Sequence, residues 1–301
     1  MPMHVNSIVS TAWLAEHLGD ADVRVLDATF LLPAAPGVAR AASAAAHIPG
    51  AVFFDIEAVS DPDTDLPHML PGDAQFGEAV GALGIGRAHH VVLYDNAAVP
   101  GAVAVAGAAR AWWMFRVFGH ERVSVLDGGM AKWQAEGRPV TAIRTPVAAQ
   151  PFGVRGNAPE QRRRLVRTKA DIQQNLNSQE ACVIDARSAG RFNGVDPEPR
   201  PGLRRGSIPN SVNVPFATLL DPTNRTFLPA DQLRAVFARA GVGVGDSQPL
   251  VASQPLVASE PLVASCGSGV TACVVALALH SLGRTDVAVY DGSWAEWGKA
   301  S

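Results

Sequence analysis

The chain has 301 residues, of which 48% are hydrophobic and 18% are charged, and its formal net charge is −3. This length corresponds to about two domains of ordinary size, and so apolar a composition excludes global disorder. The small net charge argues against electrostatic binding to nucleic acid or to an anionic membrane. The uncharged stretch at residues 97–109 contains Pro100 and Gly101 and is shorter than the ~20 residues that span a bilayer. Residues 1–10 lack the basic and apolar regions of a signal peptide. The three cysteines are odd in number and contain no C-x-x-C pair, so we expect a cytoplasmic protein.

Short apolar runs alternate with helix-like segments along the chain. The runs predict strands at residues 23–28, 51–55, 91–94 and 123–126, and again at 182–185, 211–214, 262–265 and 287–290. Helical spacing of apolar residues predicts helices at 10–18, 75–83, 110–118 and 129–136, and again at 169–175, 230–240, 270–282 and 293–297. This alternation, with continuously apolar strands, predicts an α/β fold of parallel sheets flanked by helices. Ligands of such sheets bind at the carboxyl ends of the strands.

Three motifs occur twice in the same order. V-L-D-A at 25–28 returns as V-I-D-A at 183–186, I-P-G-A-V at 48–52 as I-P-N-S-V at 208–212, and L-D-G-G at 126–129 as Y-D-G-S at 290–293. The nearly constant separations predict two copies of one domain. We expect an N-terminal domain at 1–145, a linker rich in Pro, Gln and Arg at 146–164, and a C-terminal domain at 165–301.

Cys266 directly follows the predicted strand 262–265 and opens the loop C-G-S-G-V-T before an apolar helix. Loop N–H groups and the positive end of the helix dipole favour a thiolate there, and Gly267 and Gly269 let the loop curl around it. Cys266 is therefore a candidate nucleophile, with a buried structural cysteine as the alternative. Cys182, inside a predicted strand, and Cys273, inside an apolar helix, are predicted core thiols. Three cysteines without C-x-x-C spacing favour neither a disulfide framework nor a zinc site.

The C-G-S-G-V-T loop, the duplicated domain and the paired D-G-x-x-x-x-W ends at 127–133 and 291–297 resemble the tandem-domain rhodanese superfamily. Within it, they resemble the 3-mercaptopyruvate sulfurtransferases. The resemblance implies two rhodanese-like domains, a persulfide on Cys266, and transfer of the sulfur of 3-mercaptopyruvate to thioredoxin, glutathione or cyanide, with release of pyruvate. It implies no cofactor and no metal. Thiosulfate-specific members carry basic residues in the loop, whereas Gly267 and Ser268 are neutral, which favours mercaptopyruvate.

The resemblance also implies residues that bind the donor. Arg191 in G-R-F and Arg200 in P-E-P-R correspond to the two arginines that hold the carboxylate and keto oxygen. A guanidinium group supplies the planar pair of donors that an α-keto acid needs. The loop residues that would cradle the persulfide are Gly267, Gly269, Val270 and Thr271.

A proton relay of the family maps onto Ser268, His68 and Glu57. The family usually has Asp at the last of these positions, and the longer Glu side chain leaves Asp61 or Asp65 as alternative partners for His68. The first copy has no thiol, because its strand 91–94 runs into Asp95. That copy is predicted to supply His68 and to carry no persulfide.

Three other functions compete with this interpretation. A tyrosine-phosphatase-like enzyme needs Arg six positions after its cysteine, and residue 272 is Ala, so we reject it. A non-catalytic rhodanese-like binding module is disfavoured by the combination of Cys266, Arg191 and Arg200. A thiosulfate:cyanide sulfurtransferase differs only in its donor and stays the nearest alternative.

One hexapeptide occurs three times before Cys266, as Q-P-L-V-A-S, Q-P-L-V-A-S and E-P-L-V-A-S at 248–265. A domain of this kind needs one such strand, so residues 248–259 are predicted to be a tandem-duplicated insertion. Proline lacks the N–H that a central strand requires, so the prolines exclude one long strand. Only residues 262–265 are therefore expected to form the central strand.

Overall fold

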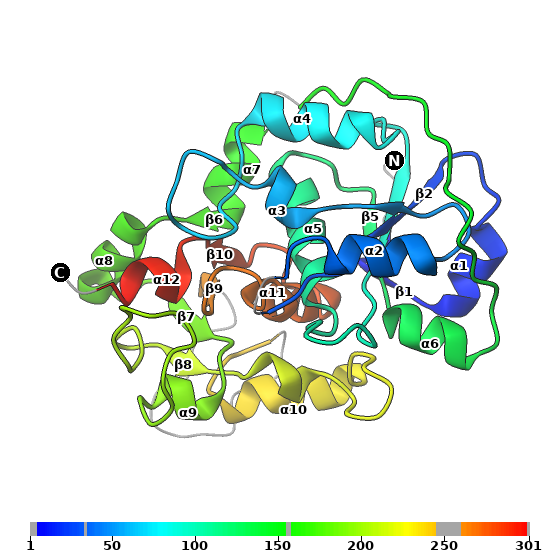
Figure 1. Ribbon diagram of the computed structural model, residues 1–301. Coiled ribbons are helices and arrows are strands. Elements are labelled where there is room, and N and C mark those ends of the chain that lie inside the picture. The colour runs from blue at the N-terminus through cyan, green and yellow to red at the C-terminus, as the bar shows by residue number, and fades with distance from the viewer. Residues whose placement is uncertain (1–4, 33–34, 155–157, 245–259, 300–301) are drawn as a thin grey trace. The chain divides into compact units, whose positions relative to one another are not determined.

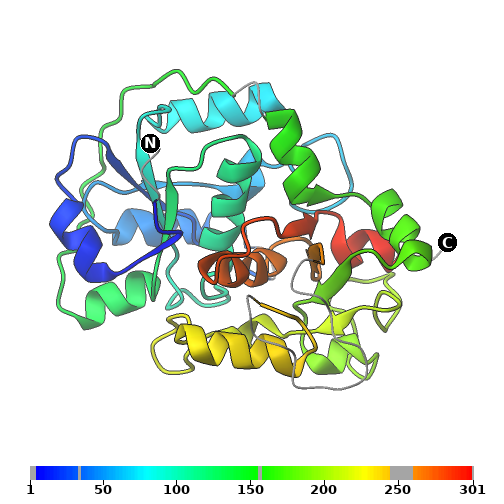
Figure 2. The same ribbon diagram turned by 180° about the vertical axis from the view of Figure 1, so that it is seen from behind.

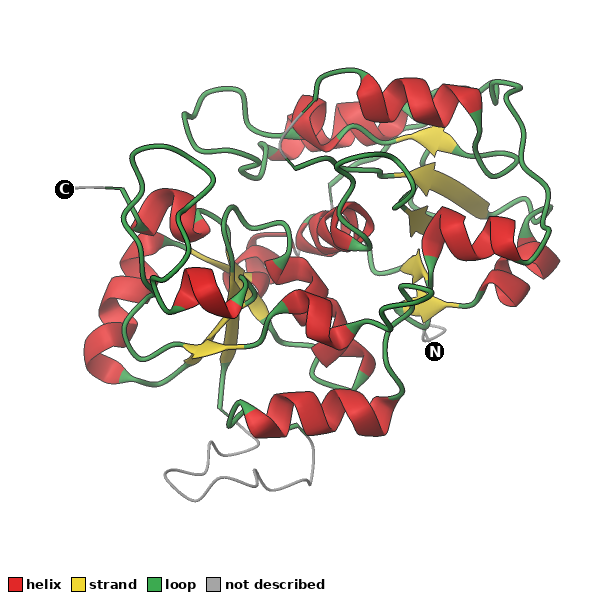
Figure 3. Ribbon diagram, turned by 60° about the horizontal axis from the view of Figure 1, so that its bottom comes forward, coloured by secondary structure: helices red, strands yellow, loops and turns green. Residues whose placement is uncertain are grey.

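The computed structural model describes residues 5–32, 35–154, 158–244 and 260–299, and these form two five-stranded parallel sheets (Figures 1 and 3). Each sheet is flanked by helices, so the predicted α/β architecture is confirmed. The triplicated segment at 248–259 lies outside the described residues.

Two compact units make up the chain, and each contains one sheet. The N-terminal unit comprises Met1–Pro62, Leu70–Gln161 and Pro222–Thr226. The C-terminal unit comprises Asp63–Met69, Arg162–Asp221 and Phe227–Ser301. Each unit therefore includes a short segment from the other half of the chain, whereas the predicted domains are each one uninterrupted range. The C-terminal unit gains His68 in this way.

The N-terminal sheet has the strand order β1-β5-β4-β2-β3, so β4 is central. Its strands are β1 (Ile8–Val9), β2 (Val23–Asp27), β3 (Val52–Phe53), β4 (His90–Tyr94) and β5 (Val123–Leu126). Its helices are α1 (Thr11–His17), α2 (Val38–Ala45), α3 (Ile56–Val59), α4 (Asp73–Ala82), α5 (Ala106–Val117) and α6 (Gly129–Ala135). Helix α5 is buried along its whole length, including Arg110 and Arg116, whose guanidinium groups lie over the rings of Trp113 and Trp112.

The C-terminal sheet has the order β6-β10-β9-β7-β8, which repeats the order of the first sheet. Its strands are β6 (Val166–Arg167), β7 (Cys182–Asp185), β8 (Val212–Asn213), β9 (Leu262–Ser265) and β10 (Ala288–Tyr290). Helices α8 (Lys169–Ser178), α9 (Ala189–Phe192), α10 (Ala230–Arg239), α11 (Ala272–Ser281) and α12 (Ser293–Trp297) and the 3-10 helix η1 (Phe216–Leu219) complete the unit. Helix α12 packs beside α8 (Figure 2). The prediction that residues 262–265 form the central strand is confirmed.

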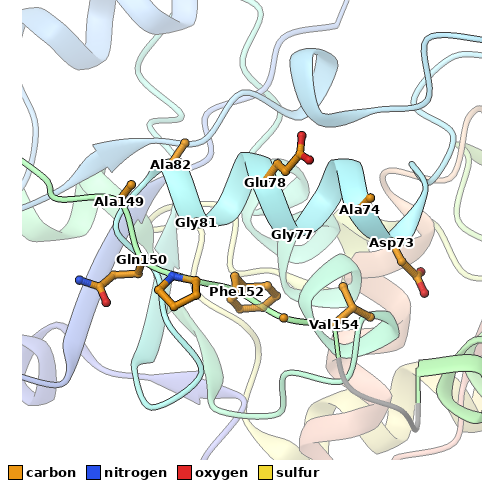
Figure 4. Close-up of a pocket in the computed structure, with 12 residues that line it drawn as sticks. Asp73, Ala74, Gly77, Glu78, Gly81, Ala82, Ala149, Gln150, Phe152 and Val154 are labelled. Carbon is orange, nitrogen blue, oxygen red and sulfur yellow. The ribbon is translucent and has the colours of Figure 1, made fainter.

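Several short elements were not predicted from the sequence. The edge strands β1 and β6 have two residues each, which is too short for any apolar period to show. Helix α7 (Ala158–Leu165) begins in the predicted linker and ends one residue beyond it. Residues 149–154 of that linker run along α4 on the side of Gly77 and Gly81 (Figure 4), and Gln150 N donates to Gly81 O at 2.9 Å. A Cβ on Gly77 would lie 2.8 Å from Phe152 O, so this approach requires glycine.

Candidate active site

The loop that begins at Cys266 follows the carboxyl end of the central strand β9 and leads into α11. Cys266 is 2% exposed. Its carbonyl oxygen accepts a hydrogen bond from Trp294 N at 3.0 Å, and Gly267 O accepts one from Ala295 N at 2.8 Å. The start of α12 therefore fixes the start of the loop.

Ser293 ties this loop together from inside, a role that the sequence analysis did not assign. Its Oγ accepts from the amides of Cys266 and Gly269, both at 3.1 Å, and donates to Tyr290 O at 2.8 Å. Ser293 is fully buried and has a φ of +47°, a left-handed conformation that is rare for serine. The amides of Cys266 and Gly269 thus bind a hydroxyl group. The binding of a persulfide by Gly267, Gly269, Val270 and Thr271 stays a prediction.

Two arginines that are far from Cys266 in sequence come to its loop. A Cβ built on Gly267 would lie 3.1 Å from Arg191 Nη2 and 3.8 Å from Arg200 Nη1. Gly267 thus leaves the space in which both guanidinium groups approach the residue next to Cys266. The structure brings together the candidate nucleophile Cys266 and the two predicted donor-binding arginines at the carboxyl end of β9.

His68 belongs to the same unit and meets one of these arginines. Arg200 Nη2 donates to His68 Nε2 at 3.2 Å, which leaves the ring proton of a neutral imidazole on Nδ1. His68 is 5% exposed and has a φ of +62°, and strained backbone of this kind clusters at functional sites. Ser268 is also buried. The Ser268–His68 relay stays a prediction.

Glu57 is an exposed residue in the first turn of α3 and belongs to the N-terminal unit. Of the two alternative acids, Asp61 lies in that unit as well, whereas Asp65 lies in the C-terminal unit with His68. Which acid partners His68 therefore stays open.

A buried ion network lies behind Arg191, and sequence reasoning missed it. Glu198 accepts from both Arg191 and Arg187, and Arg187 also pairs with Asp185 at the end of β7. Glu198 is part of the P-E-P-R motif already noted for Arg200, so this motif could have identified Glu198 from the sequence. Arg187, by contrast, carries no pattern that distinguishes it from a surface arginine.

The other two cysteines are part of the core, as predicted. Cys182 is 5% exposed and Cys273 is fully buried. Burial raises the pKa of Cys182 to about 12, so this thiol stays protonated at neutral pH. Among the described residues, no group of three or more His, Cys, Asp and Glu side chains could hold a metal ion.

Comparison with known proteins agrees with this geometry. The family model for the rhodanese-like domain matches residues 10–136 and 168–300. Human 3-mercaptopyruvate sulfurtransferase is 40% identical, over 98% of this chain and 93% of its own length. Rat thiosulfate sulfurtransferase is 42% identical, over 97% of this chain and 91% of its own. The crystal structure of SseA from Escherichia coli, a 3-mercaptopyruvate sulfotransferase, has 37% identity and a TM-score of 0.76, covering 96% of this chain and 99% of that one.

The chain belongs to the rhodanese family, and the predicted resemblance is confirmed. The expectation of a sulfur-transferring enzyme is confirmed with it, since relatives that match over nearly the whole chain are named for that activity. No helix in the described ranges is long and apolar enough to cross a membrane. The cytoplasmic location stays a prediction.

Proposed function

We propose that the protein transfers the sulfur of 3-mercaptopyruvate, through a persulfide on Cys266, to a thiol or cyanide acceptor and releases pyruvate. The approach of Arg191 and Arg200 to Gly267 carries this proposal. Two guanidinium groups beside a buried cysteine suit a donor that has a carboxylate and a keto oxygen next to its sulfur-bearing carbon.

The proposed reaction is nucleophilic catalysis in two steps. The arginines bind the carboxylate and the keto oxygen, and the thiolate of Cys266 attacks the donor sulfur. A sulfur–sulfur bond forms as the carbon–sulfur bond breaks, and the electron pair leaves on pyruvate as its enolate, which then takes up a proton. His68 and Ser268 are the candidates for moving that proton or for removing the proton of the donor thiol. In the second step a thiolate, such as that of thioredoxin or glutathione, or cyanide attacks the outer sulfur and regenerates Cys266.

The choice of donor rests on the loop, because relatives named for either donor match at nearly the same identity. Neutral Gly267 and Ser268 add no positive charge for a doubly charged sulfonyl donor. Arg191 lies so close to Gly267 that any side chain there would meet its guanidinium group. The neutral loop favours the keto acid. Thiosulfate:cyanide sulfurtransferase activity is the second candidate.

Turnover with the two donors tests the proposal. We expect pyruvate release from 3-mercaptopyruvate to exceed thiocyanate formation from thiosulfate by at least about tenfold in kcat/KM, which equals ~1.4 kcal/mol of transition-state binding. A preference for thiosulfate would establish the second candidate instead. Cys266→Ser is expected to abolish turnover with either donor, whereas Cys182→Ser, at a protonated core thiol, is the matched control that keeps it.

Arg191→Ala provides a separate test of the donor site. Removal of a group that binds the donor equally in the ground and transition states raises KM and leaves kcat nearly unchanged. Steady-state kinetics with 3-mercaptopyruvate measure both constants. An unchanged KM would remove Arg191 from the donor site.

A further inference from the structure

Glu198 is a buried carboxylate that lies between two arginines. Its side chain is 2% exposed. Its Oε1 accepts from Arg187 Nη1 at 2.7 Å, and its Oε2 accepts from Arg191 Nη2 at 2.5 Å. A carboxylate so deeply buried needs such charged donors, because burial without them would be strongly unfavourable.

The partner on one side, Arg187, is immobilised independently of Glu198. Its Nε and Nη2 donate to Asp185, its Nη2 also donates to Gly206 O at 2.8 Å, and its side chain is fully buried. Its guanidinium carbon lies 4.2 Å from the centre of the Trp294 ring, a cation–π contact. Arg187 is therefore a fixed anchor, and it holds Glu198 in place.

Arg191, on the other side, uses only one edge of its guanidinium group for Glu198. The bonds to Glu198 come from Nε, at 3.3 Å, and from Nη2. The end of the group, formed by Nη1 and Nη2, lies 3.9 and 3.1 Å from the position of a Cβ on Gly267. This end is the pair of nitrogens that binds a carboxylate in a fork. Since Arg191 is 23% exposed, other rotamers are open to it without this carboxylate.

The N-terminal unit contains the same turn without this network. Asp27 accepts from Thr29 N at 3.0 Å and from the Thr29 hydroxyl, as Asp185 accepts from Arg187 N at 2.9 Å. In the copy that has no thiol, Thr29 therefore supplies the hydrogen bonds that hold the turn. The turn itself does not require Arg187, and the arginine occurs in the copy that contains Cys266.

We propose that Glu198 is a positioning residue, which holds the end of the Arg191 guanidinium group toward the Cys266 loop and so sets the affinity for the donor carboxylate. The inference rests on the proposed function. It adds a chain of contacts that runs from Asp185 through Arg187 and Glu198 to Arg191.

Glu198→Gln tests the proposal, because glutamine keeps the shape of the side chain and removes its charge. We expect KM for 3-mercaptopyruvate to rise roughly tenfold with kcat within about twofold, the effect of losing one charge-assisted hydrogen bond. Glu198→Asp keeps the charge, so its KM should lie between those of the unsubstituted protein and Glu198→Gln. It also provides the test if the glutamine variant does not fold. Glu180→Gln, at an exposed carboxylate of the same unit, is the matched control with unchanged constants.

A double-mutant cycle separates positioning from a merely structural role. If Glu198 acts through Arg191, the variant with both Glu198→Gln and Arg191→Ala has the KM of Arg191→Ala alone. Additive effects, or a loss confined to kcat, would overturn the proposal. A raised KM in Arg191→Ala together with an unchanged KM in Glu198→Gln would refute the inference and leave the proposed function standing. An unchanged KM in Arg191→Ala would instead refute the donor site on which both depend.

Discussion

Asp95 occupies the position in the N-terminal unit that Cys266 occupies in the C-terminal unit. It directly follows the central strand β4, as Cys266 follows β9. Its carbonyl oxygen accepts from Met130 N at 3.0 Å, and that of Cys266 accepts from Trp294 N at the same distance. A carboxyl group in this place has no sulfur chemistry, so the N-terminal copy keeps the turn without a thiol.

The side chain of Asp95 is in an unusual state for a carboxylic acid. It is 4% exposed, and its Oδ2 has no hydrogen-bond partner among the described residues. Burial is the main cause that raises the pKa of Asp95 to about 7. The amides of Val105 and Ala108 lower the pKa, and the carboxylate of Asp27 raises it further. Near neutral pH, Asp95 is therefore partly protonated.

Asp95→Asn is expected to stabilise the protein more at pH 8 than at pH 5. The folded chain keeps the proton of Asp95 up to pH about 7, whereas the unfolded chain releases it near the ordinary pKa of 3.8. The stability of the unsubstituted protein therefore falls as the pH rises from about 4 to about 7 and stays lower above it. Asparagine cannot ionise and escapes this loss. Thermal midpoints at pH 5 and pH 8 measure the effect, and Asp20→Asn, at an exposed carboxylate, is the control. An equal rise of the midpoint at the two pH values would contradict the prediction.

Among the elements, helix α5 packs on its sheet through a glycine. A Cβ on Gly107 would overlap Ala28 O and lie 2.9 Å from Phe30 Cβ. The helix is fully buried, so it has no exposed side toward which it could shift. Close packing of this kind makes α5 sensitive to a single added methyl group.

Gly107→Ala is expected to destabilise the protein by on the order of 3 kcal/mol, despite the better helix propensity of alanine. The free energy of unfolding in denaturant, followed by circular dichroism, measures the loss. Gly19→Ala is the matched control, because no atom lies within 4 Å of a Cβ at that position. A Gly107→Ala variant as stable as the control would show that α5 can move away from Ala28.

The elements also show what the sequence could predict. Buried strands such as β4 and β9 are continuous apolar runs that end at a polar residue or a cysteine, so their ends, and with them Cys266, are visible in the sequence. The network of Glu198 and Arg187 is not visible, because its contacts join β7, the P-E-P-R segment and Trp294 through the fold. Ser293 is likewise 27 residues from the Cys266 amide that it binds. Residues in contacts of this kind follow no regular spacing in the sequence, and only the folded chain brings them together.

At the scale of the whole molecule, the two sheets have the same strand order, and the chain between the corresponding strands differs in length. The largest difference is the triplicated hexapeptide before β9. Gly243 and Glu260, described residues on the two sides of residues 245–259, lie near each other. Arg284 Nη1 is 3.5 Å from Gly243 O, and Arg284 Nη2 donates to Glu260 O at 2.7 Å. One guanidinium group therefore contacts both ends of the connection.

Deletion of residues 248–259 is expected to leave the thermal midpoint equal or higher and turnover within about twofold. Residues 244–247 would then join Gly243 to Glu260, and at about 3.5 Å per residue they can span the width of one guanidinium group with its two contacts. Shortening a connection changes its closure entropy only slowly, and β9 with Cys266 keeps its sequence. Removal of 245–259 is the matched over-deletion: it leaves Val244 alone for the same span and should destabilise the C-terminal unit. If the shorter deletion already prevents folding or abolishes turnover, the repeated copies are part of the fold and not an insertion.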